Sequence, residues 1–278
     1  MTEGHRLEAQ APEVSAAKAR RWGSFYFMEH MLRSMRAYVV TIVVTSVGNP
    51  LLYLFSMGVG LASIVDRSPT AHFAGVGYLA FAAPALLVSS SVMTCANEMM
   101  FPVMDGFKWR RIYYGPHVTP LVPGQLAAGH VMAVGVRLLV QCTVFFLIML
   151  AFGAAVSPFS WLIIPIGVLA GMAFGTPLMA YAARINKENF QFSMIQRFIV
   201  MPLFLFSGTF YPLETMPRPM QWIGWLSPLW HGNQLGRLAT VGPTEPLWLV
   251  AVHVLYLAAL GVAGMIWARR NYARRMDA

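Results

Sequence analysis

The stretch LLVQCTVFFLIMLAFGAAVSPFSWLIIPIGVLAGMAFGTPLMAYAA, from Leu138 to Ala183, decides the fold because its 46 residues include no charged side chain. The hydrocarbon core of a bilayer is about 30 Å thick, and a helix of roughly 20 apolar residues spans it. The stretch is therefore too long for one transmembrane helix and about right for two. Gly153 and the pair Ser157 and Pro158 interrupt it near its middle and predict the turn. The sequence thus predicts an integral membrane protein.

The composition of the whole chain agrees with this prediction. Hydrophobic residues make up 57% and charged residues 11% of the 278 positions, and the mean hydropathy is +0.57. A soluble domain carries about 25% charged residues, so this chain could not cover a water-facing surface. The net charge of +9 would suggest a nucleic-acid partner for a soluble protein. Here the basic residues flank apolar stretches, where they set topology and meet anionic lipid, so no nucleic acid is expected.

Six apolar stretches predict an all-α membrane domain with six transmembrane helices, within residues 22–268. They lie at residues 37–65, 78–97, 125–152, 161–183, 192–207 and 247–268. A Gly-Asn-Pro sequence at residues 48–50 is expected to interrupt the first helix. Residues 1–21 are polar and lack the apolar core of a signal peptide, so they predict a flexible cytoplasmic tail. Residues 269–278 predict a short, basic cytoplasmic tail.

The lysines and arginines orient these helices, because cytoplasmic segments of membrane proteins are enriched in them. With both termini in the cytoplasm, 15 of the 20 basic residues fall on the inner side. Only Arg67, Arg218 and Arg237 fall outside, while Arg137 and Arg197 lie within or beside apolar stretches. The sequence therefore predicts six helices with both termini inside.

Residues 22–36 predict an amphipathic helix that lies in the cytoplasmic interface ahead of the first transmembrane helix. Apolar residues recur on one side at spacings of three or four, at Trp22, Phe25, Met28, Leu32 and Met35. The opposite side carries Glu29, His30, Arg33 and Arg36. Such a helix either anchors the chain to the membrane or offers a docking surface to a cytosolic partner, and the two roles are compatible.

The connection between the second and third helices, residues 98–120, is long and mixes aromatic with basic residues. A loop that only sets topology needs the charges of Lys108, Arg110 and Arg111 but no aromatic side chains. Yet Phe107, Trp109, Tyr113 and Tyr114 accompany these charges. Exposed aromatic residues next to arginine are typical of a protein–protein contact. The alternative is an aromatic belt at the membrane interface.

The connection after the fifth helix, residues 206–242, is rich in Pro, Trp and Gly and poor in charge. Trp222, Trp225 and Trp230 suit a membrane interface, and the prolines predict several short helices. Non-helical backbone at membrane depth must be shielded by protein or line a cavity. We therefore expect a re-entrant segment that caps the outer mouth of a pathway.

Three polar residues in the third apolar stretch form a stripe. His130, Arg137 and Gln141 are spaced by seven and four residues, so they share one helix face. A charge at the centre of a transmembrane helix costs about 2.5–3.5 kcal/mol by insertion scales. The stripe could therefore line a substrate path or meet a carboxylate such as Glu98. In the alternative, the helix begins later and Arg137 snorkels to the cytoplasmic interface.

Signs of an enzyme or of a metal site are weak. The seven histidines form neither an H-E-x-x-H motif nor a Cys/His cluster, so no metal ion is expected. No G-x-S-x-G motif is present either, and no catalytic residue is expected. Cys95 and Cys142 lie in apolar stretches and fit small packing residues. We expect His231 to be a hydrogen-bonded structural residue.

Two segments carry a resemblance to a known family. SGTFYPLETMP at residues 207–217, followed by WLSPLWHGNQLGRL at residues 225–238, resembles ABC-2 type transporter permeases. The resemblance is greatest to the branch with nodulation-factor exporters and daunorubicin-type drug exporters. Thr119, Pro120 and Leu121 are similar to the end of that family's loop between its second and third helices. The family pattern, six helices after an interface helix, covers nearly the whole chain.

The resemblance implies a half-transporter of a bacterial cytoplasmic membrane. Two permeases form the pathway, and two separate ATPase subunits, which bind ATP and Mg²⁺, drive it. This chain has no G-x-x-x-x-G-K-[ST] phosphate loop of its own. In the family the loop after the second helix forms a coupling helix that inserts into the ATPase. That role carries over to residues 105–117, with Asp105, Phe107, Lys108, Trp109, Arg110, Arg111 and Tyr113 as contacts. The interface-helix role carries over to Trp22, Phe25, Glu29, Arg33 and Arg36.

We therefore expect a permease subunit that exports an amphiphilic molecule (a drug, a lipid or a lipid-linked saccharide) by alternating access. The candidate pathway residues are Asn49, Tyr53, Phe55, Arg137 and Phe206. The candidate residues of the outer gate are Phe210, Tyr211, Trp222, Trp225, Trp230 and His231. One alternative is a multi-span membrane enzyme that acts on lipid-linked substrates, with His231 or Glu214 at an outer site. Another is a non-transporting scaffold whose ATPase partner drives lipid rearrangement.

Overall fold

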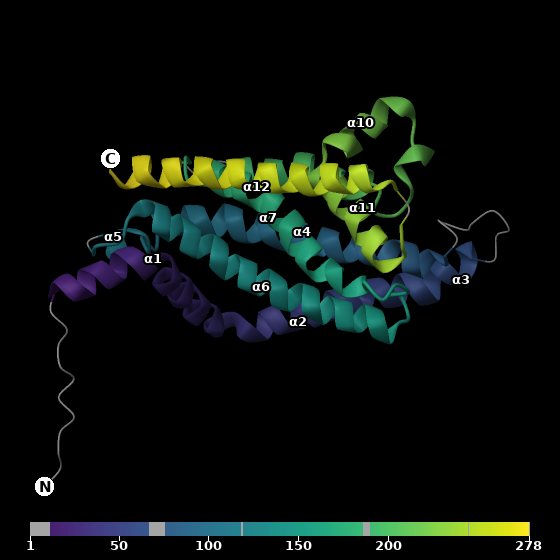
Figure 1. Cartoon of the computed structure of the whole chain (residues 1–278), viewed down its shortest axis with the longest axis horizontal. Coiled ribbons are helices and arrows are strands. Elements are labelled where there is room, and N and C mark those ends of the chain that lie inside the picture. The colour runs from purple at the N-terminus through teal and green to yellow at the C-terminus, as the bar shows by residue number, and fades with distance from the viewer. Residues whose placement is uncertain (1–11, 67–75, 118, 186–189, 244, 278) are drawn as a thin grey trace, which may run out of the picture.

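The computed structural model of the chain describes residues 12–66, 76–117, 119–185, 190–243 and 245–277. Nearly all of these residues are helical, and the long helices run along one common axis (Figure 1). The elements are α1 (Pro12–Met35), the 3₁₀ turn η1 (Arg36–Tyr38), α2 (Val39–Phe55), the π-helical η2 (Ser56–Leu61), α3 (Ala62–Val65), α4 (Tyr78–Lys108), α5 (Tyr114–His117), α6 (Pro123–Ala151), the 3₁₀ turn η3 (Ser160–Leu162), α7 (Ile163–Ala182), α8 (Gln191–Ile195), the π-helical η4 (Gln196–Val200), α9 (Met201–Phe206), the 3₁₀ turn η5 (Leu213–Thr215), α10 (Arg218–Leu226), α11 (Pro228–Thr240) and α12 (Leu247–Met276).

Five helical segments of the described chain are long and apolar enough to cross a membrane. They are Ala16–Gly58, Tyr78–Lys108, Pro123–Ala151, Ser160–Ala182 and Leu247–Met276. The predicted all-helical membrane fold is thereby confirmed. The segment expected to form the fifth of six helices is shorter, Gln191–Phe206. It consists of α8, η4 and α9, and at 1.5 Å per residue its length is about 24 Å.

Four details differ from the sequence-based expectations. The helix α1 begins at Pro12, so residues 12–21 are helical rather than a flexible tail, while residues 1–11 lie outside the described residues. The helix α4 continues past residue 97 to Lys108. The helix α12 continues past residue 268 to Met276, and its last turn carries arginines, which favour a helix C-terminus. Pro50 does not interrupt α2, since transmembrane helices tolerate proline, and the helix changes to π geometry only at η2.

Small residues let α4 and α7 pack at the centre of the bundle. Gly167, Gly171 and Gly175 form one face of α7, spaced by four residues each. A Cβ atom at Gly171 would lie 2.9 Å from the Ser91 hydroxyl oxygen, and one at Gly175 would lie 2.3 Å from the Cys95 sulfur. The Ser91 hydroxyl donates to the Gly167 carbonyl oxygen at 2.7 Å. Small residues at every fourth position are typical of close helix pairs in membranes.

The helix α1 packs against α6 at a similarly close distance. A Cβ atom at Gly129 of α6 would lie 2.6 Å from the backbone oxygen of Ser24. On the side of α1 that faces the bundle, Phe27, Met31 and Met35 are buried. The N-terminal helix is therefore part of the folded core and is not merely tethered to it.

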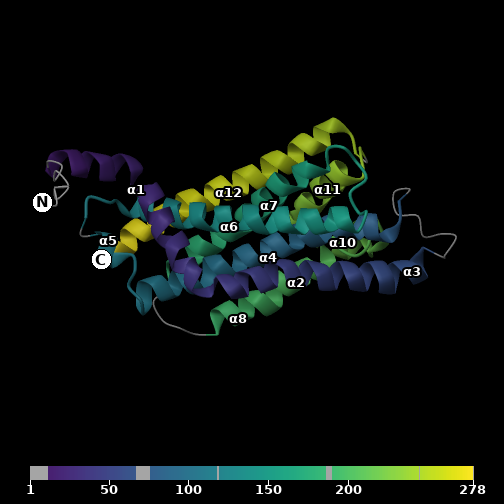
Figure 2. The ribbon, with the colours of Figure 1, turned by 90° about the horizontal axis from the view of Figure 1, so that it is seen from below.

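Different helices lie at the two ends of the bundle. Figures 1 and 2 show α1, α5 and the C-terminal end of α12 gathered at one end, with α3, α10 and α11 toward the other. At that other end, α11 packs among α4, α7 and α12. It buries polar side chains that include His231, Asn233 and Arg237. The predicted re-entrant character of this connection is consistent with α11 lying inside the bundle.

Two apolar elements leave broad faces uncovered by the rest of this chain. On α2 only Ser46, Pro50 and Leu54 are buried. Of the residues from Gln191 to Phe206, only Val200 is buried. Large exposed side chains on these two elements include Val40, Val44, Leu52, Phe55, Met194, Phe198 and Leu205.

Candidate functional site

The connection from α4 to α6 presents a compact exposed segment at the end of the bundle. The backbone N–H groups of Trp109 and Arg110 both donate to the Asp105 carbonyl oxygen at 3.0 Å. The Arg110 guanidinium also lies 3.0 Å from the Asp105 carboxylate, and its side chain is 73% exposed. Arg111 has a positive φ of 50°, which turns the chain toward the one-turn helix α5. The expected coupling helix is thus the end of α4 followed by a turn and α5; we call residues 105–117 the coupling segment.

Two of the expected contact residues in this segment are buried instead of exposed. The Phe107 ring lies 4.5 Å from the Tyr113 ring and 4.7 Å from the Tyr272 ring of α12. Burial raises the pKa of the Tyr113 phenol, and its hydroxyl oxygen lies 2.9 Å from Nδ1 of His130. The prediction that Phe107 and Tyr113 form exposed contacts is therefore wrong. The reason is the extension of α12, whose end covers this side of the coupling segment.

The packed side of α1 also differs from the apolar side expected from its spacing. Trp22 and Phe25 are exposed, and their rings lie 5.3 Å apart. Glu29 and Arg33 form an exposed ion pair of 2.6 Å, and Arg36 is exposed as well. The face of α1 that packs against α6 lies next to these residues and does not include them. All five expected interface residues are therefore exposed on the surface of this chain.

The polar stripe on α6 faces α4. Arg137 forms an ion pair with Glu98 of α4, and both side chains are largely buried. His130 Nε2 lies 3.3 Å from the Glu98 carbonyl oxygen, and Gln141 Nε2 donates to the Ser90 hydroxyl at 2.8 Å. Of the alternatives left open by the sequence, the contact between Arg137 and a carboxylate such as Glu98 is the one observed, and Arg137 does not snorkel to the interface. The stripe joins α4 to α6.

The remaining candidate pathway residues lie on the outside of this chain. Asn49, Tyr53 and Phe55 are exposed on α2. Phe206 is partly buried at the end of α9. These residues could therefore line a pathway only if another chain covered them.

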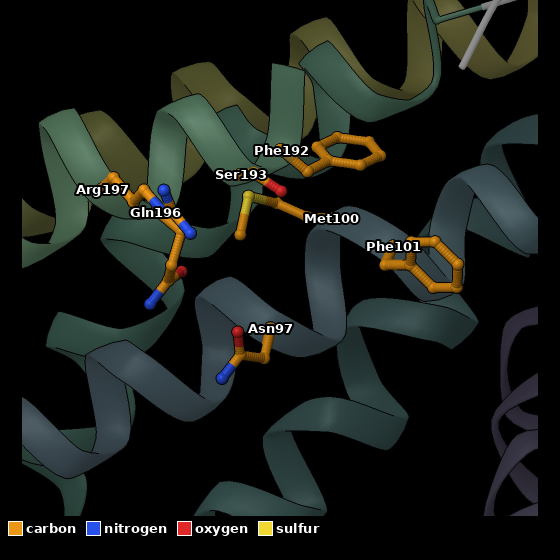
Figure 3. A pocket seen from close by; sticks show the side chains of 7 residues that line it. All are labelled: Asn97, Met100, Phe101, Phe192, Ser193, Gln196 and Arg197. Atoms are coloured by element: carbon orange, nitrogen blue, oxygen red, sulfur yellow. The ribbon is translucent and has the colours of Figure 1, made fainter. Parts of the chain in front are cut away.

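An open cavity of about 260 Å³ lies between α4 and the segment formed by α8 and η4. Figure 3 shows the side chains that line it, which are Asn97, Met100, Phe101, Phe192, Ser193, Gln196 and Arg197. Amide, hydroxyl and guanidinium groups lie beside aromatic rings and a thioether, a mixture that suits a molecule with polar and apolar parts. Among the described residues, no hydrogen-bond donor reaches the buried Oε1 atom of Gln196. Gln196 opens the π-helical turn η4, and π turns are frequent at functional sites.

At the opposite end a chain of hydrogen bonds joins α10, α11 and α12. The carbonyl oxygen of Trp225 can only accept, so His231 Nε2 donates to it, at 3.0 Å. His231 Nδ1 then accepts from Nδ1 of His253 at 2.6 Å, and His253 Nε2 lies 2.9 Å from the Glu245 carboxylate. Both ring nitrogens of His231 are therefore engaged. The expectation of a hydrogen-bonded structural histidine is confirmed, which leaves that ring no free nitrogen for acid–base chemistry.

Arg237 extends this network toward α4 and is itself almost fully buried. Its guanidinium donates to the carbonyl oxygens of Gly208 and Phe81 and to the side-chain oxygen of Gln234. It also lies 3.8 Å from the centroid of the Phe81 ring. Gln234 in turn donates to Glu245 at 2.6 Å. One arginine thus joins the turn after α9, where Gly208 has a φ of +69°, to α4 and α11.

The other candidate gate residues lie around this network. The Phe210 carbonyl oxygen accepts from the Tyr78 hydroxyl at 3.2 Å, and the Tyr211 hydroxyl donates to the Leu205 carbonyl oxygen at 3.1 Å. Trp222 and Trp225 are exposed on α10, while Trp230 packs edge-on against His231. These residues surround the network at this end of the bundle.

Comparison with known proteins places the chain in a family. A family model described as "ABC-2 type transporter" matches residues 26–239. The chain belongs to the ABC-2 type transporter family. This permease is similar to Nodulation protein J of Sinorhizobium fredii (strain NBRC 101917 / NGR234), with 25% identity over 233 residues, 83% of this chain and 86% of the relative. It is also similar to Nodulation protein J of Rhizobium leguminosarum bv. viciae, with 23% identity over 238 residues, 84% of this chain and 87% of the relative. With Nodulation protein J of Rhizobium meliloti (strain 1021) it shares 21% identity over 263 residues, 95% of this chain and 97% of the relative.

The family makes this permease a multi-pass membrane subunit of an ABC transporter and therefore a transport component. The resemblance inferred from residues 207–217 and 225–238 is confirmed, and both segments lie within the matched range.

Two features of the permease were not predicted from the sequence. The cavity joins Asn97 to Gln196 and Arg197, which are too far apart in sequence for any local pattern to pair them. The available signal was Arg197 itself, since a cation in an apolar stretch points to function. The hydrogen-bond network of His231 joins Glu245, which precedes α12, to His253 two turns inside it. An acidic residue eight positions before a histidine gave too weak a signal to find this pair.

Proposed function

We propose that the permease is one of two transmembrane protomers of an exporter in a bacterial cytoplasmic membrane. Each protomer has six spans with both termini in the cytoplasm. Separate P-loop ATPase subunits, which bind ATP and Mg²⁺, drive the transport of an amphiphilic molecule such as a drug, a lipid or a lipid-linked saccharide. The observation that carries the proposal is the mixed polar and apolar cavity between α4 and η4, on a chain whose α2 and α8–α9 lack a covering partner.

The ends of α7 and α12 favour Gln191–Phe206 as a sixth span. Near the end of α12, Asn271 donates to the carbonyl oxygen of Ala180 near the end of α7, at 2.7 Å. The two helices therefore end together, yet α12 starts at the other end of the bundle (Figure 1). The chain between them has to return along the bundle, and α8, η4 and α9 make that return. An even number of spans brings both termini to one side, in agreement with the distribution of basic residues.

Polar side chains on the uncovered faces favour a pair of protomers. Exposed apolar residues alone would suit lipid, which solvates them well. However, Asn49, Tyr53 and Arg197 are also exposed on these faces, and polar groups facing hydrocarbon are costly. A second copy of the permease, or a homologous one, would shield these groups and complete a pathway between the protomers.

The cavity supports an amphiphilic substrate. Arg197, Asn97 and Ser193 offer donors to a polar head group, and the unpaired oxygen of Gln196 can accept from an N–H or O–H group of the same molecule. The rings of Phe101 and Phe192 and the Met100 thioether can contact an apolar portion. The cavity is open, so a molecule larger than its volume can extend beyond it.

The direct test is co-purification of the permease from its native membranes in mild detergent, followed by mass spectrometry and an ATPase assay. We expect a P-loop ATPase in stoichiometric amount, and a second permease sequence if the pair is heterologous. A permease that purifies alone, under conditions that keep other ABC transporters of the same membranes assembled, would contradict the proposal and favour a membrane enzyme.

Substitution of the exposed tip of the coupling segment tests the ATPase contact. Replacing both Trp109 and Arg110 with alanine should lower the amount of co-purified ATPase by at least tenfold, because exposed Trp and Arg side chains dominate interface energies. The matched control is Trp222→Ala with Arg218→Ala, an exposed pair on α10 at the other end of the bundle. Equal recovery of ATPase with both double variants would remove the coupling role from this segment.

Cysteine labelling tests the orientation of the spans. Cys95 and Cys142 are both buried and should give little background with a membrane-impermeant maleimide. Trp222→Cys should be labelled on intact cells, since α10 lies at the predicted outer end. Asp277→Cys should be labelled only after permeabilisation. The opposite pattern would reverse the proposed topology.

A further inference from the structure

The inner end of α12 holds the C-terminal end of α7. Asn271 Nδ2 donates to the Ala180 carbonyl oxygen at 2.7 Å, and Arg275 Nη1 donates to the Ala183 carbonyl oxygen at 2.8 Å. The last four carbonyl groups of a helix have no partner within it. Two side chains one helical turn apart on α12 therefore satisfy one of these groups, at Ala180, and the carbonyl group of Ala183, the residue that follows α7. A cation at this position is also favoured by the helix dipole.

The same turn of α12 contacts the coupling segment. The Tyr272 ring lies edge-on to Phe107 at 4.7 Å and to Tyr113 at 5.0 Å, and all three side chains are buried. The Arg275 guanidinium lies 4.5 Å from the centroid of the Phe107 ring, a cation–π geometry. Residues 272 and 275 therefore join the coupling segment to α12, and Arg275 touches both the segment and α7.

This contact is tight enough to carry movement. Phe107 lies only two residues before the exposed Trp109, and both belong to the coupling segment. Protein interiors are close-packed and do not deform continuously. A displacement of the tip of the coupling segment must therefore either shift the Tyr272 and Arg275 side chains or open a cavity around Phe107. The second outcome costs contact energy, so the first is favoured.

The end of α7 lies beside the start of α8, which lines the candidate transport cavity. Ala183 lies eight residues before Gln191, the first residue of α8. The Tyr181 hydroxyl also donates to the Gln191 side chain at 3.4 Å. The cavity residues Phe192 and Gln196 follow within two turns. A side chain of α12 that bonds to the end of α7 is therefore near the start of α8, which lines the cavity.

We propose that Tyr272 and Arg275 are positioning residues that transmit movement of the coupling segment, through the end of α7, to the cavity side of α8 and η4. This inference rests on the proposed function, in which an ATPase acts on the coupling segment. It assigns to the C-terminal end of α12 a mechanical role, although its composition alone predicted only a basic tail. Neither residue touches the transported molecule in this arrangement.

The experiment uses the permease reconstituted in liposomes together with its co-purified ATPase. Ser193→Cys places a thiol in the exposed rim of the cavity, where maleimide labelling can be measured with ATP absent and after trapping with ATP and vanadate. In this background Arg275→Gln is compared with Arg274→Gln, a neighbouring exposed arginine. Arg275→Lys is the conservative variant, since an ammonium can still donate to the Ala183 carbonyl oxygen but lacks the planar face of the guanidinium.

We expect trapping to change the labelling rate at residue 193 in the parent and in Arg274→Gln. In Arg275→Gln the rate of ATP hydrolysis should stay within twofold of the parent, while the change in labelling rate falls at least fivefold. Arg275→Lys should recover part of that change. Tyr272→Leu, which removes the two ring contacts, should give the same loss as Arg275→Gln.

An undiminished labelling response in Arg275→Gln would overturn the inference and leave the proposed function intact. A parallel loss of hydrolysis and response in both Arg275→Gln and Arg275→Lys would also overturn it, because it would indicate a role in assembly. Failure of any ATPase to co-purify with the parent would instead refute the proposed function, and the inference with it. The two failures are thus distinguishable in one preparation.

Discussion

Replacing Arg137 with leucine is expected to destabilise the permease by about 3–5 kcal/mol, because the substitution leaves the Glu98 carboxylate buried without its cation. The ion pair joins α4 to α6, and neighbouring members of the same stripe bond the same two helices. The loss should appear as a lower melting temperature in detergent and a lower yield of folded protein. Transport by whatever protein remains folded should be close to normal, since the pair does not line the cavity.

The control for this prediction is the double variant Arg137→Leu with Glu98→Leu. Replacing both partners of a buried ion pair by apolar residues of similar size is often neutral or stabilising. The double variant should therefore regain most of the stability lost by Arg137→Leu, and a double-mutant cycle would give the coupling energy. A single variant as stable as the parent would contradict the structural role. A stable single variant without transport would return Arg137 to the pathway.

The apolar stretches were sufficient to predict most helix positions, and the reason is physical. A span must satisfy its own backbone hydrogen bonds and present apolar side chains to lipid, so its limits appear in the local sequence. The predicted helix at residues 125–152 and the observed Pro123–Ala151 differ by only two residues or fewer at each end. The pairing of Arg137 with Glu98 was among the alternatives that the sequence offered. A buried charge needs a partner, and Glu98 is the first residue after the apolar stretch at residues 78–97.

Burial in the coupling segment was not predictable from the segment itself. Phe107 and Trp109 are both aromatic and only two residues apart, yet Phe107 is 2% exposed and Trp109 46% exposed. The difference depends on Tyr272, a residue far along the chain on a helix that was expected to end at residue 268. The packed face of α1 could not be predicted for a similar reason. The close approach at Gly129 of α6 determines which side of α1 packs against that helix. Local periodicity predicts that a segment is helical, but which face of that helix is buried depends on tertiary contacts.

Replacing Arg237 with leucine is expected to have the largest effect at the outer end, a loss of folded permease that lowers its yield at least tenfold. The guanidinium is almost fully buried and bonds the carbonyl oxygens of Gly208 and Phe81 and the side chain of Gln234. Each buried polar group left without a partner costs about 1–3 kcal/mol. The buried Gly208 carbonyl oxygen would lose its Arg237 donor, and the contacts of the guanidinium with the Phe81 ring and the Gln234 side chain would be lost with it. These losses are large against the stability of a typical domain, about 5–15 kcal/mol. The yield is measured by size-exclusion chromatography of the detergent extract.

Two further variants separate the bonds of Arg237 from its charge. Arg237→Lys keeps a buried cation but cannot reproduce the fork of guanidinium donors, so it should restore only part of the yield. Arg218→Leu removes an exposed arginine of α10 and should leave the yield unchanged.

Normal recovery of Arg237→Leu would mean that water or lipid replaces the lost donors. In that case α11 would not depend on the Arg237 contacts to Gly208 and Phe81. Loss with Arg237→Leu but not with Arg218→Leu would instead show that the Arg237 contacts are required to hold α11 and the turn after α9 to α4. Any opening of this end of the bundle during transport would then have to break or carry along the Arg237 contacts.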